Sequence, residues 1–336
     1  MDKTVIFSVA GAGKTTYIVN SLTKTKKTLI VTYTVGNYDN LCKKICDKFN
    51  GMWPENICVM KYFSFLYHFC YKPFFSDKLK LKGICFENNS SNSLSQDNIK
   101  YYITKSRYVY SNRLSLLIEK QGAMNELKLR LEKYFDEFIV DEIQDISGRD
   151  FNFLEQLMST NINMLFVGDF FQHTYDTSRD GRTNTNLFKS FRDYEKRFIN
   201  HNFISDNSTL VKSWRCSPSV CQFITNNLGI EIHSNKDLEG DSDVVFISDD
   251  FQKERILSDP NIVKLHYQKA QIYGIGHKNW GETKGEDHYK DVCVLLNKNT
   301  ATKYAVGRLN ELSPITRNKL YVAITRAHGK VYLVNE

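Results

Sequence analysis

The sequence has no apolar run long enough to cross a lipid bilayer, and no signal-peptide core follows Met1. These absences argue against a membrane protein or a secreted protein, so we expect a soluble protein of the cytoplasm with no membrane partner. The eight cysteines never form a Cys-x-x-Cys pair. This argues against a zinc or iron–sulfur site and favours reduced cysteines that pack inside an intracellular protein.

The size and charge of the chain set broad limits on its function. A chain of 336 residues with 41% hydrophobic residues can bury two ordinary cores. The net charge of +7 is compatible with a polyanionic partner but does not require one. The composition therefore leaves the function open, and the motifs have to decide it.

The first informative segment is the apolar run Val5–Val9, which leads into small residues and then Gly13-Lys14-Thr15. Backbone amides in such a loop can surround a phosphate at the N-terminus of the following helix. We expect Lys14 to reach the β- and γ-phosphates and the Thr15 hydroxyl to bind Mg²⁺. Ser8 stands where the full pattern has glycine, and a glycine-rich turn before an ordinary helix is the alternative. The candidate nucleotide-binding residues are Ala10, Gly11, Ala12, Gly13, Lys14, Thr15 and Thr16.

A second apolar run, Thr28–Thr34, follows the expected first helix. Strand, helix and strand joined by short loops predict a parallel sheet, which binds ligands at the carboxyl edge of its strands. Thr32, Tyr33 and Thr34 lie at that edge and offer two hydroxyls and an aromatic ring. These groups suit a phosphate backbone and a stacked base. An ordinary strand end explains them equally well.

The segment Lys61–Lys72 is rich in aromatic residues. Aromatics at this density indicate a helix that packs into a core. The interleaved Lys61, His68 and Lys72 also allow a groove for a single nucleic-acid strand. We interpret residues 62–132 as a mostly helical insertion between strands of the sheet.

A third informative segment is Phe138–Asp145, where an apolar strand delivers Asp141 and Glu142 to the same edge as the glycine-rich loop. In a nucleotide hydrolase the first acid holds Mg²⁺ through water, and the second polarises the attacking water. The alternative is a solvated acidic turn. The preceding apolar residues favour the catalytic interpretation.

These segments together resemble the UvrD/Rep branch of the superfamily 1 DNA helicases and translocases. The resemblance rests on motifs that occur in the family's order over nearly the whole chain. They are Ala10–Thr15, Thr32–Thr34, Lys61–Ser64, Asp141–Asp145, Val167–Gln172, Ser213–Cys216, Thr283–Glu286 and Tyr321–Ala327.

The resemblance implies a role for further residues. Gln172 would sense the γ-phosphate, and Arg215 and Arg326 would act as arginine fingers, because a guanidinium stabilises the charge that develops on the phosphate oxygens. Gly285 and Glu286 would couple the nucleotide to the nucleic acid. Nucleic-acid contacts are implied for Tyr62, Ser64 and Tyr175, in addition to Thr32, Tyr33 and Thr34.

The chain also departs from the family. Only four residues precede the first strand, so the upstream glutamine segment that reads adenine has no counterpart. The few dozen residues between Arg215 and Lys284 are too few for the large 2B insertion. Trp280 lies beside His277 and Lys278, and we expect it either to stack on a base or to pack against the neighbouring lobe.

We therefore expect an α/β fold with two RecA-like P-loop NTPase lobes and parallel sheets. The first lobe would span residues 1–206, with the insertion at about 62–132, and the second would span residues 207–336, with Ala301–Leu312 as a helix. The expected function is an ATP- and Mg²⁺-dependent motor on single-stranded DNA, or RNA. The alternative is a nucleotide-gated DNA-binding switch or sensor subunit of a phage-defence or repair assembly, with a protein partner such as a nuclease.

Overall fold

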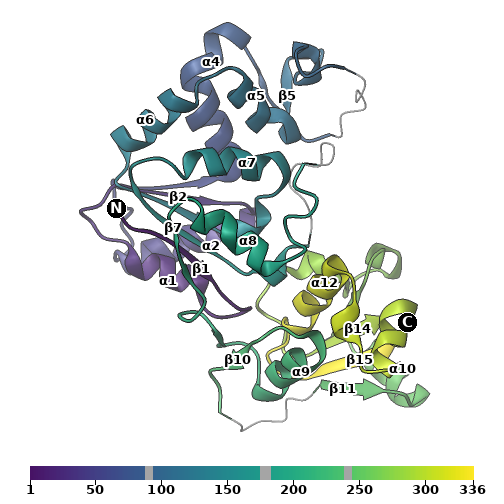
Figure 1. Ribbon diagram of the computed structural model, residues 1–336. Helices are drawn as coiled ribbons and strands as arrows, with labels where there is room; N and C mark the ends of the chain where they lie inside the picture. Colours follow the sequence, from purple (N-terminus) through teal and green to yellow (C-terminus); the bar gives the residue numbers. More distant parts are fainter. Residues whose placement is uncertain (88–93, 175–182, 238–243) are drawn as a thin grey trace. The chain divides into compact units, whose positions relative to one another are not determined.

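The computed structural model describes residues 1–87, 94–174, 183–237 and 244–336 (Figure 1). The chain divides into two compact units. The first unit comprises Met1–Ile6, Thr15–Gly168 and Asp176–Asp206, and the second comprises Phe7–Lys14, Asp169–Tyr175 and Asn207–Glu336. Each unit contains a parallel β-sheet, so the predicted fold class is confirmed. The predicted boundary between residues 206 and 207 stays a prediction.

The first unit is built on a six-stranded sheet with the strand order β3-β2-β6-β7-β1-β8. The strand pairs β2–β3, β2–β6, β6–β7 and β1–β8 are all parallel. The strands are β1 (Lys3–Phe7), β2 (Thr28–Thr32), β3 (Ile57–Lys61), β6 (Glu137–Asp141), β7 (Asn163–Gly168) and β8 (Ile204–Asp206). The connecting helices are α1 (Lys14–Ser21), α2 (Val35–Lys48), α7 (Gly148–Leu157) and α8 (Phe191–Ile199).

An insertion separates β3 from β6 in the first unit (Figure 1). It starts with the short helix α3 (Tyr62–Ser64) and a π-helix (Phe65–Tyr71). It continues through α4 (Lys72–Leu79), β4 (Gly83–Cys85), β5 (Tyr108–Tyr110), α5 (Leu114–Lys120) and α6 (Met124–Tyr134). The described part of the insertion is therefore mostly helical, as predicted, but it also contains the parallel strand pair β4–β5.

The second unit is built on a five-stranded sheet with the order β11-β15-β14-β12-β13, in which every pair is parallel. Its strands are β11 (Val244–Ile247), β12 (Val263–His266), β13 (His277–Asn279), β14 (Val292–Leu296) and β15 (Val331–Asn335). Its helices are α9 (Pro218–Leu228), α10 (Asp250–Ser258), α11 (Lys298–Ala305) and α12 (Pro314–Ile324), and β9 (Lys212–Ser213) pairs with β10 (His233–Ser234). The central strand β14 is buried along its whole length.

Local sequence signals explain where several helices begin and end. Thr34 caps α2, because its hydroxyl accepts a hydrogen bond from the backbone N–H of Asn37 at 3.2 Å. Ser217 caps α9 in the same way, Pro218 occupies the first turn, and Gly229 ends the helix in a left-handed conformation. The predicted helix Ala301–Leu312 is wrong in its bounds.

Candidate nucleotide-binding site and nucleic-acid contacts

The glycine-rich loop lies between β1, which ends at Phe7, and α1, which starts at Lys14. Gly11 and Gly13 have φ values of +70° and +87°, a region that favours glycine. A Cβ atom at Gly11 would lie 2.8 Å from both the Ser213 Oγ and the Arg215 Cβ. Glycine is therefore required at position 11 for conformation and for space.

Three hydrogen bonds of its own backbone groups hold this loop within the second unit. The Val9 N–H donates to the Leu210 carbonyl at 2.9 Å, and the Gly11 carbonyl accepts from the Trp214 N–H at 2.9 Å. The Ala10 N–H donates to the hydroxyl of Tyr321 at 2.8 Å. The loop thus has a fixed conformation at the start of α1, as a preformed phosphate site needs.

The Tyr321 hydroxyl links the loop to a carboxylate. It donates to the Asp169 Oδ2 at 3.0 Å while it accepts from Ala10. Burial, followed by the negative charge of Asp169, raises the pKa of Tyr321, so the hydroxyl keeps its proton. Tyr321 and Asp169 were not among the predicted site residues, although they lie in the motifs Tyr321–Ala327 and Val167–Gln172. The sequence signal that could have identified Tyr321 is a hydroxyl group within the apolar run of α12.

The acidic pair follows β6 in the first unit. Asp141 is the last residue of the strand and is 2% exposed, and Glu142 is 9% exposed. Glu142 has a φ of +57°, which is unusual for a residue with a side chain and occurs often at functional sites. The Gln144 side-chain amide donates to the Glu142 carboxylate. This contact orients the predicted general base.

Gly168 makes room for Gln144. A Cβ atom at Gly168, the last residue of β7, would lie 2.3 Å from the Gln144 Oε1 and 2.6 Å from the Ile143 Cγ2. The glycine therefore lets the segment after β6 pack against the end of β7. Because Gln144 donates to the Glu142 carboxylate, this packing also helps to position Glu142.

The oxygen donors that were predicted for Mg²⁺ are a hydroxyl and a carboxylate. Thr15 lies in the first turn of α1, and Asp141 lies at the carboxyl end of β6. Both residues belong to the first unit. Oxygen donors of these two types are the ligands that Mg²⁺ prefers, so the residues fit this ion. The Thr16 hydroxyl, which is farther along α1, accepts from the Lys44 ammonium at 2.8 Å.

Gln172 ends a short 3₁₀ turn, Phe170–Gln172, and is 4% exposed. Its backbone N–H donates to the Asp169 carbonyl at 2.9 Å, and the Asp169 carboxylate accepts from the Phe171 N–H at 3.0 Å. Asp169 therefore fixes this turn and also contacts Tyr321.

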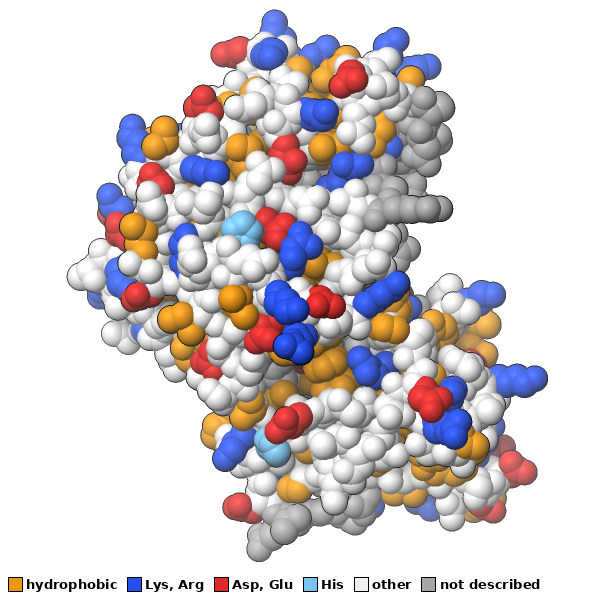
Figure 2. Space-filling model, viewed as in Figure 1, with side chains coloured by type: hydrophobic (Ala, Val, Ile, Leu, Met, Phe, Trp, Pro, Cys, Tyr) orange, Lys and Arg blue, Asp and Glu red, His pale blue; other side chains and the backbone are white. Residues whose placement is uncertain are grey.

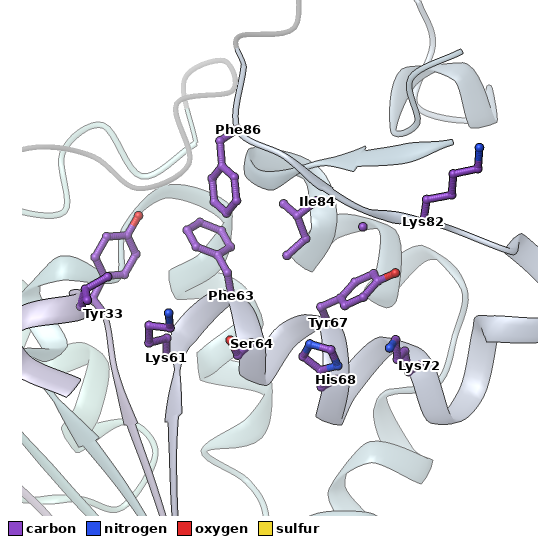
Figure 3. A pocket seen from close by; sticks show the side chains of 12 residues that line it. Tyr33, Lys61, Phe63, Ser64, Tyr67, His68, Lys72, Lys82, Ile84 and Phe86 are labelled. Carbon is purple, nitrogen blue, oxygen red and sulfur yellow. The ribbon is translucent and has the colours of Figure 1, made fainter. Parts of the chain in front are cut away.

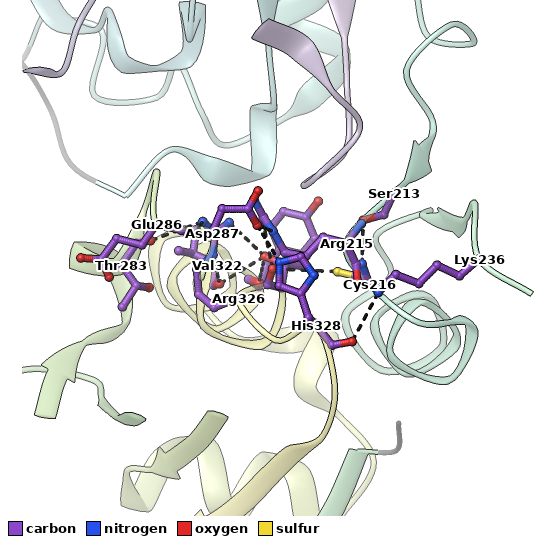
Figure 4. Close-up of polar contacts among 12 residues, drawn as sticks. Ser213, Arg215, Cys216, Lys236, Thr283, Glu286, Asp287, Val322, Arg326 and His328 are labelled. Atoms are coloured by element: carbon purple, nitrogen blue, oxygen red, sulfur yellow. Dashed lines mark hydrogen bonds and ion pairs between the residues drawn. The ribbon is translucent and has the colours of Figure 1, made fainter. Parts of the chain in front are cut away.

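Arg215 lies in a polar cluster of the second unit (Figure 4). Its Nε pairs with the Asp287 carboxylate, and its Nη1 donates to the Thr325 carbonyl at 3.1 Å. Burial alone would raise the pKa of Asp287, but the hydrogen bond and charge of Arg215, and then His328, hold it below its usual range. Asp287 therefore stays ionised and orients Arg215.

Arg326 is 1% exposed and lies close to Arg215 (Figure 4). Its guanidinium donates to the carbonyls of Val322 at 3.1 Å, Thr283 at 3.3 Å and Glu286 at 3.1 Å. Burial, followed by the charge of Arg215, lowers the pKa of Arg326 to about 10. The side chain is still a cation at neutral pH, and it donates hydrogen bonds to backbone carbonyls and to the Thr325 hydroxyl.

The segment Thr283–Glu286 forms a turn next to Arg326. The Glu286 N–H donates to the Thr283 carbonyl at 3.1 Å, and Gly285 has a φ of +85°. The Glu286 carboxylate pairs with Lys278 and accepts from the Tyr289 hydroxyl. In this arrangement Glu286 is thus bound to protein groups.

The residues predicted to contact nucleic acid have different environments. Tyr33 and Ser64 line a cavity of the first unit. Thr34 uses its hydroxyl to cap α2. Thr32 is 1% and Tyr62 is 2% exposed, so both side chains are buried in the first unit, and their contact with nucleic acid stays a prediction. Tyr175 lies outside the described residues.

Trp280, which was also predicted to contact nucleic acid, lies inside the second unit. The side chain is completely buried, and its indole N–H donates to the Leu265 carbonyl at 2.9 Å. Its ring contacts Tyr267 edge to face, with the ring centroids 5.4 Å apart. In this structure Trp280 therefore packs within the second unit, against Leu265 and Tyr267.

The charged side chains on the face shown in Figure 2 are of mixed sign, with Lys and Arg interspersed among Asp and Glu. Attraction of a polyanion on this face would therefore depend on local groups rather than on one continuous basic surface.

Among the described residues, no helix combines the length and the apolar character needed to cross a membrane.

Comparison with known proteins gives a family match. The profile of the viral superfamily 1 RNA helicase core domain matches residues 118–335. A comparison with curated protein sequences gave no match. Two solved structures of arterivirus nonstructural protein 10, a helicase, one of them in complex with DNA, are similar to 98% of this chain at 15% identity and a TM-score of 0.49. The similarity covers 60% of the chain in the DNA complex and 59% in the other structure.

Proposed function

Because the chain belongs to the viral superfamily 1 RNA helicase core domain family, we propose that it is a motor that hydrolyses a nucleoside triphosphate and moves along a single nucleic-acid strand. The observation that carries the proposal is that three of the predicted phosphate-binding groups belong to the second unit. The glycine-rich loop, Arg215 and Arg326 all belong to this one compact unit. Phosphate-binding amides and cations that stabilise phosphoryl transfer thus come from the same unit.

The proposal gives each group a chemical role. The loop amides from Gly11 to Lys14 bind the phosphates at the N-terminus of α1, and the Lys14 ammonium neutralises the terminal phosphates. Mg²⁺, held by Thr15 and Asp141, would supply a Lewis acid that draws charge from the phosphate oxygens. Glu142, oriented by Gln144, accepts a proton from the attacking water.

The arginines couple nucleotide turnover to movement. In the described arrangement Arg215 contacts Asp287 and Thr325, and Arg326 contacts backbone carbonyls. We propose that a bound triphosphate draws these guanidinium groups from their protein partners to its γ-phosphate, and that hydrolysis returns them. The two states differ in contacts, which is what a nucleotide-driven movement requires.

We further propose that the nucleotide is ATP and that the strand is single-stranded DNA, as in the UvrD/Rep branch. The proposed location is the cytoplasm. RNA is the alternative strand, since the matched family is that of viral superfamily 1 RNA helicases. Glu142→Gln should lower the maximal ATP turnover about 100- to 10,000-fold while the protein still binds ATP. Retained turnover in this variant would contradict the role of Glu142.

A specific observation also favours the switch function as a second candidate. Both arginines are bound to protein groups, so nucleotide could regulate contacts with a protein partner without any movement along a strand. Displacement of streptavidin from the end of a biotinylated DNA or RNA strand separates the two functions. A motor removes streptavidin only when ATP is present and Lys14 is intact. A switch hydrolyses or binds ATP without displacement.

A further inference from the structure

A cavity in the first unit lies outside the proposed nucleotide site. It has a volume of about 630 Å³ and lies between the end of β2, the π-helix and β4 (Figure 3). We call it the aromatic recess, because Tyr33, Phe63, Tyr67 and Phe86 supply most of its large side chains. Its volume falls in the range of small-ligand pockets, which is enough for one or two nucleotides but not for a long strand.

The rings of the recess form a connected set. Phe63 and Phe86 meet edge to face with their centroids 5.1 Å apart, and Tyr33 lies 5.8 Å from Phe63 (Figure 3). Phe63 is half-buried, whereas Phe86 is 66% exposed. An exposed aromatic side chain costs free energy in water unless something covers it. A planar ligand that inserts beside these two rings would cover it.

The π-helix explains why these side chains share one wall. The Lys72 N–H donates to the Tyr67 carbonyl, five residues back, as in a π-helical turn. The wider turn makes residues four and five apart neighbours. Phe63, Tyr67, His68 and Lys72 follow this spacing and all line the recess. The Tyr67 hydroxyl is anchored to the Leu81 carbonyl at 3.1 Å.

The charge of the recess is positive. Its cations are Lys61, Lys72 and Lys82, and none of the described residues that line it is acidic. Lys72 and Lys82 are exposed, and the Lys72 ammonium lies 5.3 Å from the centre of the Tyr67 ring. Burial, followed by the charge of Lys72, lowers the pKa of His68. His68 therefore offers a mostly neutral ring at pH 7, and the lysines provide the charge.

Aromatic rings beside lysines fit a planar base that carries a phosphate. We propose that the aromatic recess takes one nucleotide out of the bound strand, with the base against Phe63 and Phe86 and its phosphate at Lys72 and Lys82. This inference rests on the proposed function, because the nucleotide belongs to the strand on which the motor acts. A free nucleotide has the same chemistry, and the experiment has to distinguish these two sources.

The test uses variants whose side chains are at least partly exposed, so that the fold is retained. Phe86→Ala and the double variant Lys72→Ala/Lys82→Ala are compared with wild type by fluorescence anisotropy on a labelled single strand of about 12 nucleotides. Tyr134→Ala, which removes an exposed ring of α6 outside the recess, and Lys120→Ala, which removes an exposed cation of α5, are matched controls.

The expected results follow from stacking and charge. Phe86→Ala should raise the Kd roughly 5- to 100-fold, as expected for the loss of one stacked base. The double lysine variant should lower the slope of log Kd against log salt by about 1.4, or 0.7 for each lost phosphate contact. Both controls should bind as wild type does. Turnover without any strand should be unchanged in all variants.

Photo-crosslinking provides a direct location. A strand with 5-iodouracil, irradiated on the protein, should crosslink to a peptide that contains Phe63 or Phe86. Crosslinks found only elsewhere, or an unchanged Kd in Phe86→Ala, would overturn the inference. A mononucleotide that competes as well as the strand would make the recess a free-nucleotide site and would also overturn it. If no strand stimulates wild-type turnover, the proposed function fails instead.

Discussion

The hydroxyl of Tyr321 lies 2.8 Å from the backbone nitrogen of Ala10 and accepts its hydrogen bond. These residues are 311 positions apart in the sequence. The same hydroxyl donates to Asp169, so one buried side chain joins the glycine-rich loop, the turn before Gln172 and α12. The conformation of the glycine-rich loop therefore depends on α12.

Tyr321→Phe should destabilise the protein and weaken nucleotide binding. The substitution leaves the Ala10 N–H and one Asp169 contact without their partner, and a buried polar group without a partner costs about 1–3 kcal/mol. Urea unfolding measures the loss. Tyr304→Phe is the matched control, because it removes a hydroxyl from the same unit while keeping the ring stacked on Phe246. Equal stability of Tyr321→Phe and wild type would contradict the bridging role.

Gly168→Ala should lower turnover by displacing Gln144. The added methyl group would overlap with Gln144 and Ile143, and crowding of this kind costs about 1–3 kcal/mol. Because Gln144 orients Glu142, a shift of about 1 Å would lower turnover roughly 100-fold. Steady-state phosphate release measures this effect. In Gly36→Ala the new methyl group meets nothing within 4 Å, so this control should keep full turnover.

Trp280→Phe should destabilise the second unit without weakening nucleic-acid binding. The change removes the donor to the Leu265 carbonyl and leaves a small cavity, for an expected loss of about 1–3 kcal/mol. Trp53→Phe removes a similar indole contact, to the Ile57 carbonyl, from a ring that is 41% exposed, and it should cost less. Weaker strand binding by folded Trp280→Phe, measured by anisotropy at low temperature, would contradict this expectation and support stacking of Trp280 on a base.

His277 should make stability depend on pH. Its Nδ1 lies 2.8 Å from the Nε2 of His266, whose other ring nitrogen contacts Glu336, and Tyr273 stacks on both rings. Burial, followed by the charges of His266 and Lys264, lowers the pKa of His277 below 6.5. Below about pH 6.5 the unfolded chain binds more protons than the folded chain, so stability is lost as the pH falls.

This linkage can be measured by urea unfolding at about pH 7.5 and about pH 5.5. Wild type should lose more unfolding free energy between these two values than His277→Gln, in which the titrating group is absent. His233→Gln is the control, because His233 is an exposed histidine of the same unit that pairs with the exposed Glu231. A pH dependence that is the same in wild type and in His277→Gln would contradict the assignment to His277.

Local sequence patterns predicted the elements whose signals lie within a few residues of each other in the sequence. Apolar runs followed by small or acidic residues placed the glycine-rich loop after β1 and Asp141 at the end of β6. The predicted helix Ala301–Leu312 was misplaced, because Asn297 caps α11 earlier and Gly307 follows it with a φ of +67°. Caps and glycines outweighed the apolar pattern there.

Side-chain roles were harder to predict, because they depend on distant contacts. Trp280 has basic neighbours in the sequence, but its ring faces Leu265 and Tyr267. Tyr62 and Phe63 are adjacent, and only Phe63 lines the recess. The burial of Arg326 among carbonyls comes from the turn at Thr283–Glu286, 40 or more residues away. Spacing alone does not reveal such contacts.

The central claim is that nucleotide hydrolysis is coupled to a single nucleic-acid strand. The measurement that tests it most directly is the ATP turnover rate of the purified protein with and without single-stranded DNA or RNA, with Lys14→Ala as the blank. We predict a strand-dependent increase that is absent in Lys14→Ala and that weakens as the salt concentration rises, because phosphate contacts are screened. A rate that is the same with and without either strand would contradict the claim.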